Sequence, residues 1–382
     1  MSIQDHPPPR VAPEAPPRAE ADAILERALA ETDLLTPSQE LNIRAKVEDL
    51  VRGRLVWESV PFRVILESNR RCNLACTMCD NVHTGNGELD AGLVERLYDR
   101  IGPGAVEIQP FGAGEPTLSP MDQLAPLARR HNQYFNFITN GVLFTRAYHE
   151  RIADRVGRVQ FSIHSHRAEV SDRITASTDH AEVVANLEDA VVLGDQTGTH
   201  VLASMVVMDD NLDELPDYVR FMGDRGVRRI LFSRLYPTSS VYAEQGIERC
   251  REQEEIDDIA AAALEAALEH GIYLETNIES IVTDPRNRPH ERSRFDLLHE
   301  NAHIVELFRP EFCISTAITI FVEWDGTVLP CFQHRIPLGN LYEQSFDEIW
   351  NGSAMQRHRQ RFFRRDLEDF CARCQRFFCD HA

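Results

Sequence analysis

The sequence has no long apolar run and no surplus of positive charge, and each absence excludes a class of protein. No uninterrupted apolar stretch approaches the roughly 18 residues that a membrane-spanning helix requires. The first residues, MSIQDHPPPRVAPEAPPRAEAD, lack the apolar centre of a secretory signal. We therefore expect a cytoplasmic protein with no membrane partner. The net charge of −21 repels the phosphates of nucleic acid and argues against that partner too.

The acidic balance leaves two interpretations open. It can serve solubility alone, or it can favour a cationic or neutral substrate. The basic stretch at 357–365, RHRQRFFRR, is predicted to be the solvated face of a helix, with a nucleic-acid patch as the alternative.

The 382 residues allow one large domain and a smaller one. Proline and a lack of aromatic residues at the start predict disorder. The expected parts are a disordered extension (1–22), a helical lead-in (23–60), a core (61–282), a bridge (283–312) and a small C-terminal domain (313–382).

The core alternates short β-branched runs with amphipathic stretches. The predicted strands lie at 62–68, 105–112, 134–141, 158–165, 200–208 and 228–236. Helices are expected near 90–101, 120–131, 145–155, 179–196 and 212–225, followed by a helix at 252–271 and a strand at 272–278. This order predicts an α/β fold with a parallel sheet that closes partly, as a partial (β/α)6 barrel. Functional side chains are expected where the strands end.

Nine cysteines are present, and their odd number without an export signal argues against disulfides. Cys72, Cys76 and Cys79 follow the first predicted strand directly. A structural zinc ion needs four ligands, which three local thiols do not supply. In a [4Fe–4S] cluster, three thiolates bind three irons and leave the fourth open to another ligand.

The C-x3-C-x2-C pattern on this loop resembles the radical S-adenosylmethionine (radical SAM) superfamily. The resemblance implies that the open iron binds SAM and that one electron from the cluster breaks the S–C5′ bond. The 5′-deoxyadenosyl radical then abstracts hydrogen from a substrate. It also implies a one-electron donor such as flavodoxin or ferredoxin.

The end of the second strand, FGAGEPTL, is similar to the family motif that binds the SAM amino group. The matching positions are Gly112, Gly114, Glu115 and Pro116. Ala113 replaces the glycine that is usual in its position. A carboxylate that pairs with an ammonium group, and glycines that let backbone approach it, suit this role.

Further positions match the family after later strands. The third strand ends in Thr139–Gly141, a familiar ending, and the fourth ends at Ser162, which matches a serine that contacts SAM. Arg173 matches an arginine that pairs with the SAM carboxylate, and Asn186 also fits the pattern. His164 stands where an aspartate is common, which puts a carboxylate contact at that position in doubt.

The C-terminal region resembles the SPASM/twitch extension of radical SAM enzymes. The sequence TAITIFVEWDGTVLPC predicts a hairpin around an Asp-Gly turn, and LGNLYEQSFDEIWNG follows it. The candidate ligands of an auxiliary [4Fe–4S] cluster are Cys313, Cys331, Cys371 and Cys374. Five available cysteines suggest the shorter, one-cluster form, with Cys379 as a spare or substitute ligand. A four-cysteine zinc site is the alternative.

The resemblance implies an oxidoreductase or epimerase-type enzyme. We expect a small polar metabolite as the substrate, such as a sugar or aminocyclitol, because residues 1–60 are too few for a leader-binding domain. A radical peptide or protein maturase is the alternative, and a non-catalytic zinc or iron–sulfur scaffold is a third hypothesis. Cys250 is either a small apolar residue or the hydrogen donor of an epimerase. Three polar residues lie near strand or motif ends: His83, Asp209 and Tyr236. Each is expected to be a polar rim residue, with contact to substrate as the alternative.

Overall fold

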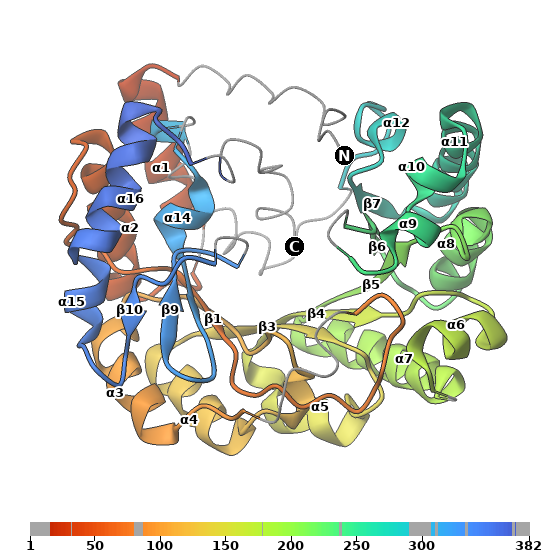
Figure 1. Cartoon of the computed structure of the whole chain (residues 1–382), viewed down its shortest axis with the longest axis horizontal. Coiled ribbons are helices and arrows are strands. Elements are labelled where there is room, and N and C mark those ends of the chain that lie inside the picture. The colour runs from red at the N-terminus through yellow and green to blue at the C-terminus, as the bar shows by residue number, and fades with distance from the viewer. Residues whose placement is uncertain are drawn as a thin grey trace.

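A ten-stranded sheet forms the centre of the molecule, in the order β10-β9-β8-β1-β2-β3-β4-β5-β6-β7 (Figure 1). The computed structural model describes residues 16–31, 33–79, 87–177, 179–236, 239–289, 307–309, 312–332, 335–368 and 371. The strands are β1 (Arg63–Leu66), β2 (Glu107–Gln109), β3 (Tyr134–Thr139), β4 (Val156–Ser162), β5 (His200–Val207), β6 (Arg229–Arg234), β7 (Tyr273–Thr276), β8 (Thr319–Val322), β9 (Thr327–Leu329) and β10 (Gly339–Asn340). The sheet is open, which confirms the predicted α/β partial barrel.

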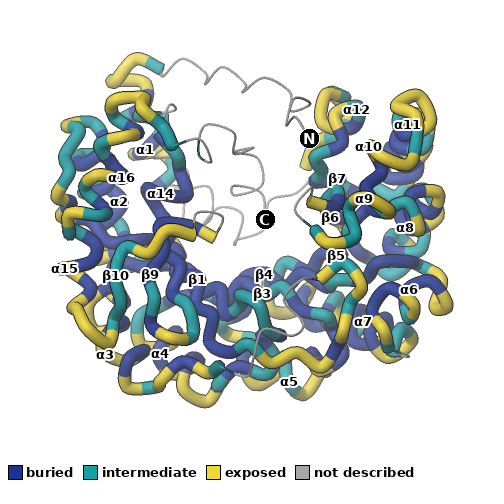
Figure 2. Tube along the Cα trace, viewed as in Figure 1, coloured by how far each residue is buried: buried dark blue, intermediate teal, exposed yellow. Residues whose placement is uncertain are grey.

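Helices follow the strands and cover the outer side of the sheet (Figures 1 and 2). They are α1 (Arg18–Glu31), α2 (Pro37–Val51), α3 (Ala91–Ile101), α4 (Met121–His131), α5 (Arg146–Ile152), α6 (Ala168–Thr175), α7 (His180–Thr197), α8 (Leu215–Gly223), α9 (Tyr242–Gln245), α10 (Ile247–Cys250), α11 (Gln253–His270), α12 (Glu279–Val282), α14 (Ile314–Ile318), α15 (Phe346–Trp350) and α16 (Ser353–Arg364), with short 3₁₀ turns η1 (Pro116–Leu118), η2 (Ala153–Arg155) and η3 (Leu212–Glu214). Among the described residues, no helix has the length and apolar character to cross a membrane.

The sheet extends beyond the six predicted strands in both directions. The strand predicted at 272–278 is β7, which pairs in parallel with β6. On the other side, β8 pairs in parallel with β1, so that Arg63 lies opposite Thr319. The hairpin predicted around the Asp-Gly turn is confirmed as β8 and β9, and Gly326 adopts a φ of +80° there. The C-terminal segment therefore continues the barrel sheet.

The two faces of the sheet differ in chemistry because strand side chains alternate. Residues such as Val64, Phe137 and Phe161 face the helices and belong to the main apolar core. We call the opposite, concave side the inner face. Its polar members include Arg63, Glu107, Gln109, Asn136, Arg158, Gln160, Ser162, Ser204, Arg229 and Glu275.

Buried ion pairs neutralise the charges of the inner face. Arg63 on β1 pairs with Glu107 on β2 at 3.0 Å. Glu275 on β7 lies 2.9 Å from Arg229 and 3.2 Å from Arg158, which comes from β4. The Arg158–Glu275 pair therefore spans two intervening strands, β5 and β6, across the concave side.

The first helix begins earlier than predicted. Residues 18–22 lie in α1, within the segment expected to be disordered, while 1–15 lie outside the described residues. Arg18 explains the difference, because it pairs with Asp22 one turn later at 2.9 Å and with Glu48 of α2 at 3.2 Å. Most of the predicted bridge, at 290–306, also lies outside the described residues.

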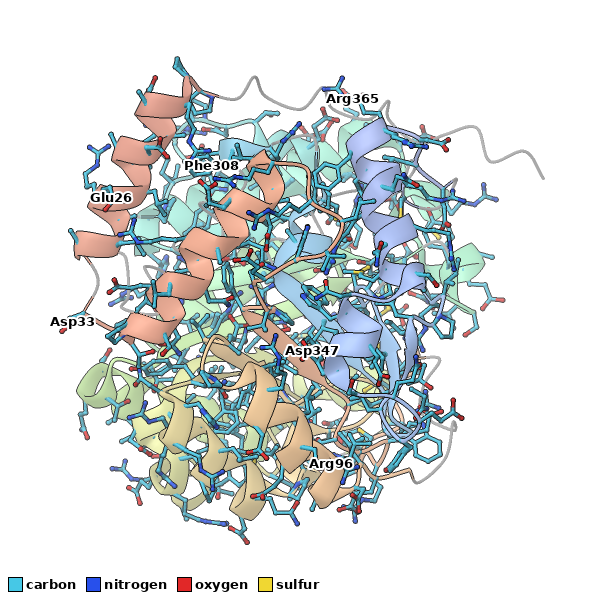
Figure 3. The ribbon with its side chains drawn as sticks, turned by 90° about the vertical axis from the view of Figure 1, so that its left-hand side faces the viewer. Glu26, Asp33, Arg96, Phe308, Asp347 and Arg365 are labelled. Carbon is cyan, nitrogen blue, oxygen red and sulfur yellow. The ribbon has the colours of Figure 1, made fainter. Side chains whose placement is uncertain are left out.

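N-terminal and C-terminal helices lie side by side on one flank of the barrel (Figures 1 and 3). Trp57, after α2, packs on Trp350 of α15 with ring centroids 5.8 Å apart. Lys46 and Arg359 lie over these two rings, and both cationic side chains are fully buried. The basic stretch predicted to be solvated thus forms α16 but buries Arg359. Asp347, labelled in Figure 3, joins α15 to Arg100 of α3 at 2.8 Å.

Candidate active site

The loop after β1 carries the three clustered cysteines at the carboxyl end of the sheet. Cys72 and Cys79 are exposed and Cys76 is half-buried. The loop is fixed to the end of α6, where the Thr77 amide donates to the carbonyl of Ile174 at 2.8 Å. The three thiols therefore occupy a defined loop at the edge where the resemblance predicts them.

These thiols fit an iron–sulfur cluster better than a single metal ion. Burial is the main cause that raises the pKa of Cys76 to about 12, and repulsion from Cys79 and Cys72 adds to it. Cys72 is exposed at the surface, but partial desolvation by its surroundings raises its pKa as well. A group that binds thiolates must supply positive charge to offset this cost. Within the described part of the chain, no three His, Cys, Asp or Glu side chains converge on one ion. A cluster needs no such convergence, because each thiolate binds a different iron.

Glu115 is the central carboxylate of the site, and it is only 3% exposed. Its Oε1 accepts hydrogen bonds from the Thr117 hydroxyl at 2.7 Å and the Thr139 hydroxyl at 2.6 Å, and from the Thr117 amide at 3.0 Å. Its Oε2 accepts from the Asn140 amide at 2.8 Å. Burial raises the pKa of Glu115, and these hydrogen bonds oppose that shift. Oε2 thus has capacity for a further donor.

Asn140 connects the carboxylate to the cysteine loop. Its backbone amide binds Glu115, while its side-chain amide donates to Asn73 Oδ1 at 2.8 Å and lies 3.8 Å from the Cys72 sulfur. Asn186, predicted from the family pattern, holds the same turn by donating to the carbonyls of Gly141 and Val142 at 2.9 and 3.1 Å. The end of β3 therefore positions Glu115 beside Cys72.

The two predicted glycines are required by close packing between loops. A Cβ on Gly114 would lie 2.5 Å from the carbonyl oxygen of Asn69, and one on Gly112 would lie 2.5 Å from Cγ of Glu67. Such distances exclude a side chain at either position. The glycines therefore let the loop after β2 rest on the loop after β1.

The remaining predicted SAM contacts lie on neighbouring elements. Ser162 ends β4 on the inner face, opposite Ser204. Arg173 lies on α6, more than half exposed, and is 3.8 Å from Asp210. His164 is buried, which lowers its pKa to about 4, and its Nδ1 accepts the Val206 amide at 3.2 Å. His164 is therefore neutral near pH 7 and is engaged with the backbone of β5.

Cys250, the tentative hydrogen donor, ends α10. Its thiol is exposed and lies 3.3 Å from the Glu244 carbonyl, to which it donates. Asp209 forms an ion pair with Arg251, so its carboxylate already has a cationic partner. The role of Cys250 stays a prediction: Cys250→Ala should abolish product while SAM cleavage persists. His83 lies outside the described residues, and Tyr236 is 41% exposed.

The predicted ligands of the auxiliary cluster come from three C-terminal elements. Cys313 immediately precedes α14, Cys331 follows β9 and is buried, and Cys371 follows α16. Cys313 and Cys371 pack against the main core. Cys374 and Cys379 lie outside the described residues. The choice of ligands and the single auxiliary cluster stay predictions.

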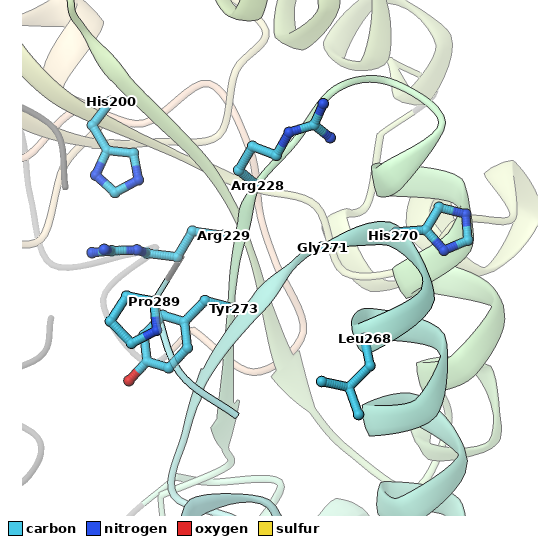
Figure 4. A pocket seen from close by; sticks show the side chains of 8 residues that line it. All are labelled: His200, Arg228, Arg229, Leu268, His270, Gly271, Tyr273 and Pro289. Carbon is cyan, nitrogen blue, oxygen red and sulfur yellow. The ribbon is translucent and has the colours of Figure 1, made fainter. Parts of the chain in front are cut away.

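A pocket of about 410 Å³ lies at the opposite, amino-terminal end of β5, β6 and β7 (Figure 4). His200, Arg229, Tyr273 and Pro289 approach it from one side (Figure 4). Because these strand ends are remote from the cysteine loop, this pocket is not the candidate site.

Sequence reasoning missed the role of Glu67, which directly follows β1 and is 2% exposed. Its carboxylate accepts hydrogen bonds from Arg70, Ala113 and Trp324. The signal in the sequence is a carboxylate next to a buried strand, five residues before Cys72, but it does not reveal these distant partners.

Comparison with known proteins agrees with this geometry. A family model described as the radical SAM superfamily matches residues 66–222, and SPASM, an iron–sulfur cluster-binding domain, matches 313–375. A tungsten-containing aldehyde ferredoxin oxidoreductase cofactor-modifying protein of Pyrococcus furiosus is 24% identical over 75% of this chain and 79% of its own. A PqqA peptide cyclase of Gluconobacter oxydans is 28% identical over 78% of each chain. SuiB of Streptococcus suis, solved with S-adenosylmethionine, shares the fold with a TM-score of 0.61 at 14% identity, covering 95% of this chain and 82% of SuiB.

These findings correct the predicted substrate and partner. A sugar, aminocyclitol or other small polar molecule is wrong, because relatives that match 78% and 83% of the chain are PqqA peptide cyclases. The length of residues 1–60 is a poor guide to the substrate, because it gives no information about which molecules the barrel binds. The scaffold hypothesis also fails. The chain belongs to the radical SAM superfamily, as an enzyme with a C-terminal SPASM domain whose cofactors are S-adenosylmethionine, a [4Fe–4S] cluster and auxiliary iron–sulfur clusters.

Proposed function

We propose that this enzyme is a peptide or protein maturase, which abstracts hydrogen from a residue of a polypeptide substrate. The observation that carries this proposal is the similarity to PqqA peptide cyclases, which extends over 78% of the chain at 28% identity. SuiB, which shares the fold, has also been solved with its precursor peptide SuiA.

The inner face of the open sheet supports a substrate rich in amide groups. An extended peptide must satisfy its backbone N–H and C=O groups when it leaves water. Gln160 supplies a side-chain amide on this face, whereas the amide nitrogens of Gln109 and Asn136 donate to Glu107. Gln160 is 6% exposed, and its Oε1 has no hydrogen-bond partner in the described part of the chain. A peptide N–H is a suitable donor for that oxygen.

The residues of the site have separate tasks. Cys72, Cys76 and Cys79 hold the cluster, which when bound supplies the electron that cleaves SAM. Glu115 accepts the SAM ammonium group through Oε2, and its low exposure strengthens that ion pair. Asn140 keeps the carboxylate and the cysteine loop together.

Deuterium transfer tests the proposal directly. The anaerobically reconstituted enzyme is incubated with SAM, dithionite and deuterated peptides encoded beside its gene. A maturase transfers deuterium into 5′-deoxyadenosine and changes the mass or stereochemistry of one peptide. Transfer from deuterated sugars or aminocyclitols, with none from peptides, would contradict the proposal.

A further inference from the structure

Glu67 is hydrogen-bonded to its own loop and to two segments that are distant in sequence. Its Oε1 accepts the amide of Ala113, in the glycine loop after β2, at 3.0 Å. Its Oε2 accepts Nε of Arg70, in the cysteine loop, and the amide of Trp324, at the tip of the β8–β9 hairpin, both at 3.3 Å. With 2% exposure, this carboxylate has almost no access to water and depends on these donors.

Two glycines show that these segments are closely fitted. A Cβ on Gly112 would lie 2.5 Å from Cγ of Glu67. A Cβ on Gly87 would lie 2.1 Å from the ring of Trp324. The guanidinium of Arg70 also lies over that ring, 5.9 Å from its centroid. The hairpin tip thus rests on the residues that flank the cysteine loop.

This contact joins the two cofactor-binding regions. Arg70 lies two residues before Cys72, and Ala113 lies two residues before Glu115. On the other side, the hairpin continues through β9 to Cys331, a predicted ligand of the auxiliary cluster. One carboxylate therefore bonds the SAM loops and the SPASM hairpin at the same time.

We propose that Glu67 is a positioning residue that couples the SPASM hairpin to the SAM-binding loops. The hairpin supports the glycine loop through Glu67, so that loosening either partner weakens SAM binding. Glu67 touches neither the cluster nor the substrate in this role, and the inference does not depend on whether the substrate is a peptide.

The test compares Glu67→Gln with Glu323→Gln in the full-length protein carrying its clusters. An amide nitrogen cannot accept a hydrogen bond, so either orientation of the introduced amide leaves at least one of the three donors without its partner. Glu323 lies on the same hairpin but pairs with Arg335, at 2.9 Å, and serves as the matched control. Hydrogen exchange of segments 107–118 and 319–330 is measured, together with SAM affinity and iron content.

In Glu67→Gln we expect about tenfold faster exchange in both segments and about tenfold weaker SAM binding, with iron content retained. Glu323→Gln should change neither. Gly87→Ala displaces the Trp324 ring and keeps the Glu67 carboxylate and the Gly87 carbonyl that accepts the Arg70 amide, and it should also weaken SAM binding. Unchanged SAM affinity in Glu67→Gln or in Gly87→Ala, or equal effects in the Glu323 control, would overturn the inference.

Discussion

At the scale of single residues, the candidate SAM site depends on the buried carboxylate of Glu115. Glu115 receives four hydrogen bonds, and none of its donors is a cation. Its negative charge therefore remains available to an incoming ammonium group. A glutamine in its place should lose that attraction, and its amide nitrogen also leaves either the Asn140 amide or the donors at Oε1 without an acceptor.

Glu115→Gln should raise the dissociation constant of SAM by about ten- to a hundredfold, which is the expected loss for a charge-assisted hydrogen bond. The measurement is a SAM titration of the reduced cluster followed by electron paramagnetic resonance. Thr117→Val, which removes one donor and keeps the charge, should change the constant by less than about threefold. Equal affinities for Glu115→Gln and the parent protein would refute the assignment.

The sequence could identify functional residues that belong to a local pattern, and it could not identify those that act through a partner far along the chain. The cysteine spacing and the glycine-rich motif are local, so their positions could be predicted. Asn140 and Glu67 act through bonds between segments that are far apart, and no local pattern reports such bonds. His164 shows the same limit, because its partner is an amide on the neighbouring strand.

The two sets of cluster-binding cysteines are assigned to different elements of the fold. The SAM cluster is assigned to the loop after β1, and the auxiliary cysteines are assigned to elements around β8 and β9. Replacing one set of ligands should therefore leave the other set able to bind iron.

Replacing Cys72, Cys76 and Cys79 with alanine should remove about four iron atoms per chain and abolish SAM cleavage. Replacing Cys331 should remove only the auxiliary iron and leave reductive SAM cleavage measurable without substrate. Iron analysis and 5′-deoxyadenosine quantification of both variants distinguish loss of the SAM cluster from loss of the auxiliary iron. Loss of all iron in both variants would argue against separate sites.

The contact between α2 and α16 contains two buried cations. Burial, reinforced by Arg359, places the pKa of Lys46 well below 10.5, and burial lowers that of Arg359 to about 9. Nearby tryptophan rings favour a charged amine, but full burial and a second cation outweigh them. Lys46 Nζ has no hydrogen-bond partner in the described residues, whereas Arg359 donates to Leu55 and Asn351.

Lys46→Met should raise the free energy of unfolding by about 1–3 kcal/mol at pH 7. The folded protein binds fewer protons at Lys46 than the unfolded chain, so the parent protein gains stability as the pH rises towards 10.5. The variant should show a flatter profile in denaturant unfolding between about pH 7 and 9. Arg359→Met should instead destabilise, since the Leu55 carbonyl loses the donor Arg359, while Asn351 Oδ1 keeps only the Trp57 amide. A steeper profile in Lys46→Met would contradict a lowered pKa of Lys46.

The whole molecule is organised around one continuous sheet. Its six central strands were predictable from β-branched runs bounded by helical periodicity. The parallel pairing of β8 with β1 was not, because residues 63–66 and 319–322 are more than 250 positions apart and parallel pairing leaves no local turn signal. The domain boundary at 313 remains a prediction.

A chain cut after residue 312 should fail to fold cooperatively. The cut removes β8, whose Ile320 and Val322 are fully buried. It also turns β1 into an edge strand, because the side of β1 that pairs with β8 loses its partner. Thermal unfolding followed by circular dichroism and size-exclusion chromatography provides the measurement. A monomer that unfolds in one sharp transition would show that the barrel is independent of its C-terminal extension.

The Arg158–Glu275 pair has a mechanical consequence. It connects β4 directly to β7 across the concave side of the sheet, although β5 and β6 lie between them in the strand order. The pair helps to set the curvature of that half of the sheet toward its amino-terminal end, beside the pocket lined by His200 and Arg229. Because both groups are less than 10% exposed, added salt should leave this curvature unchanged.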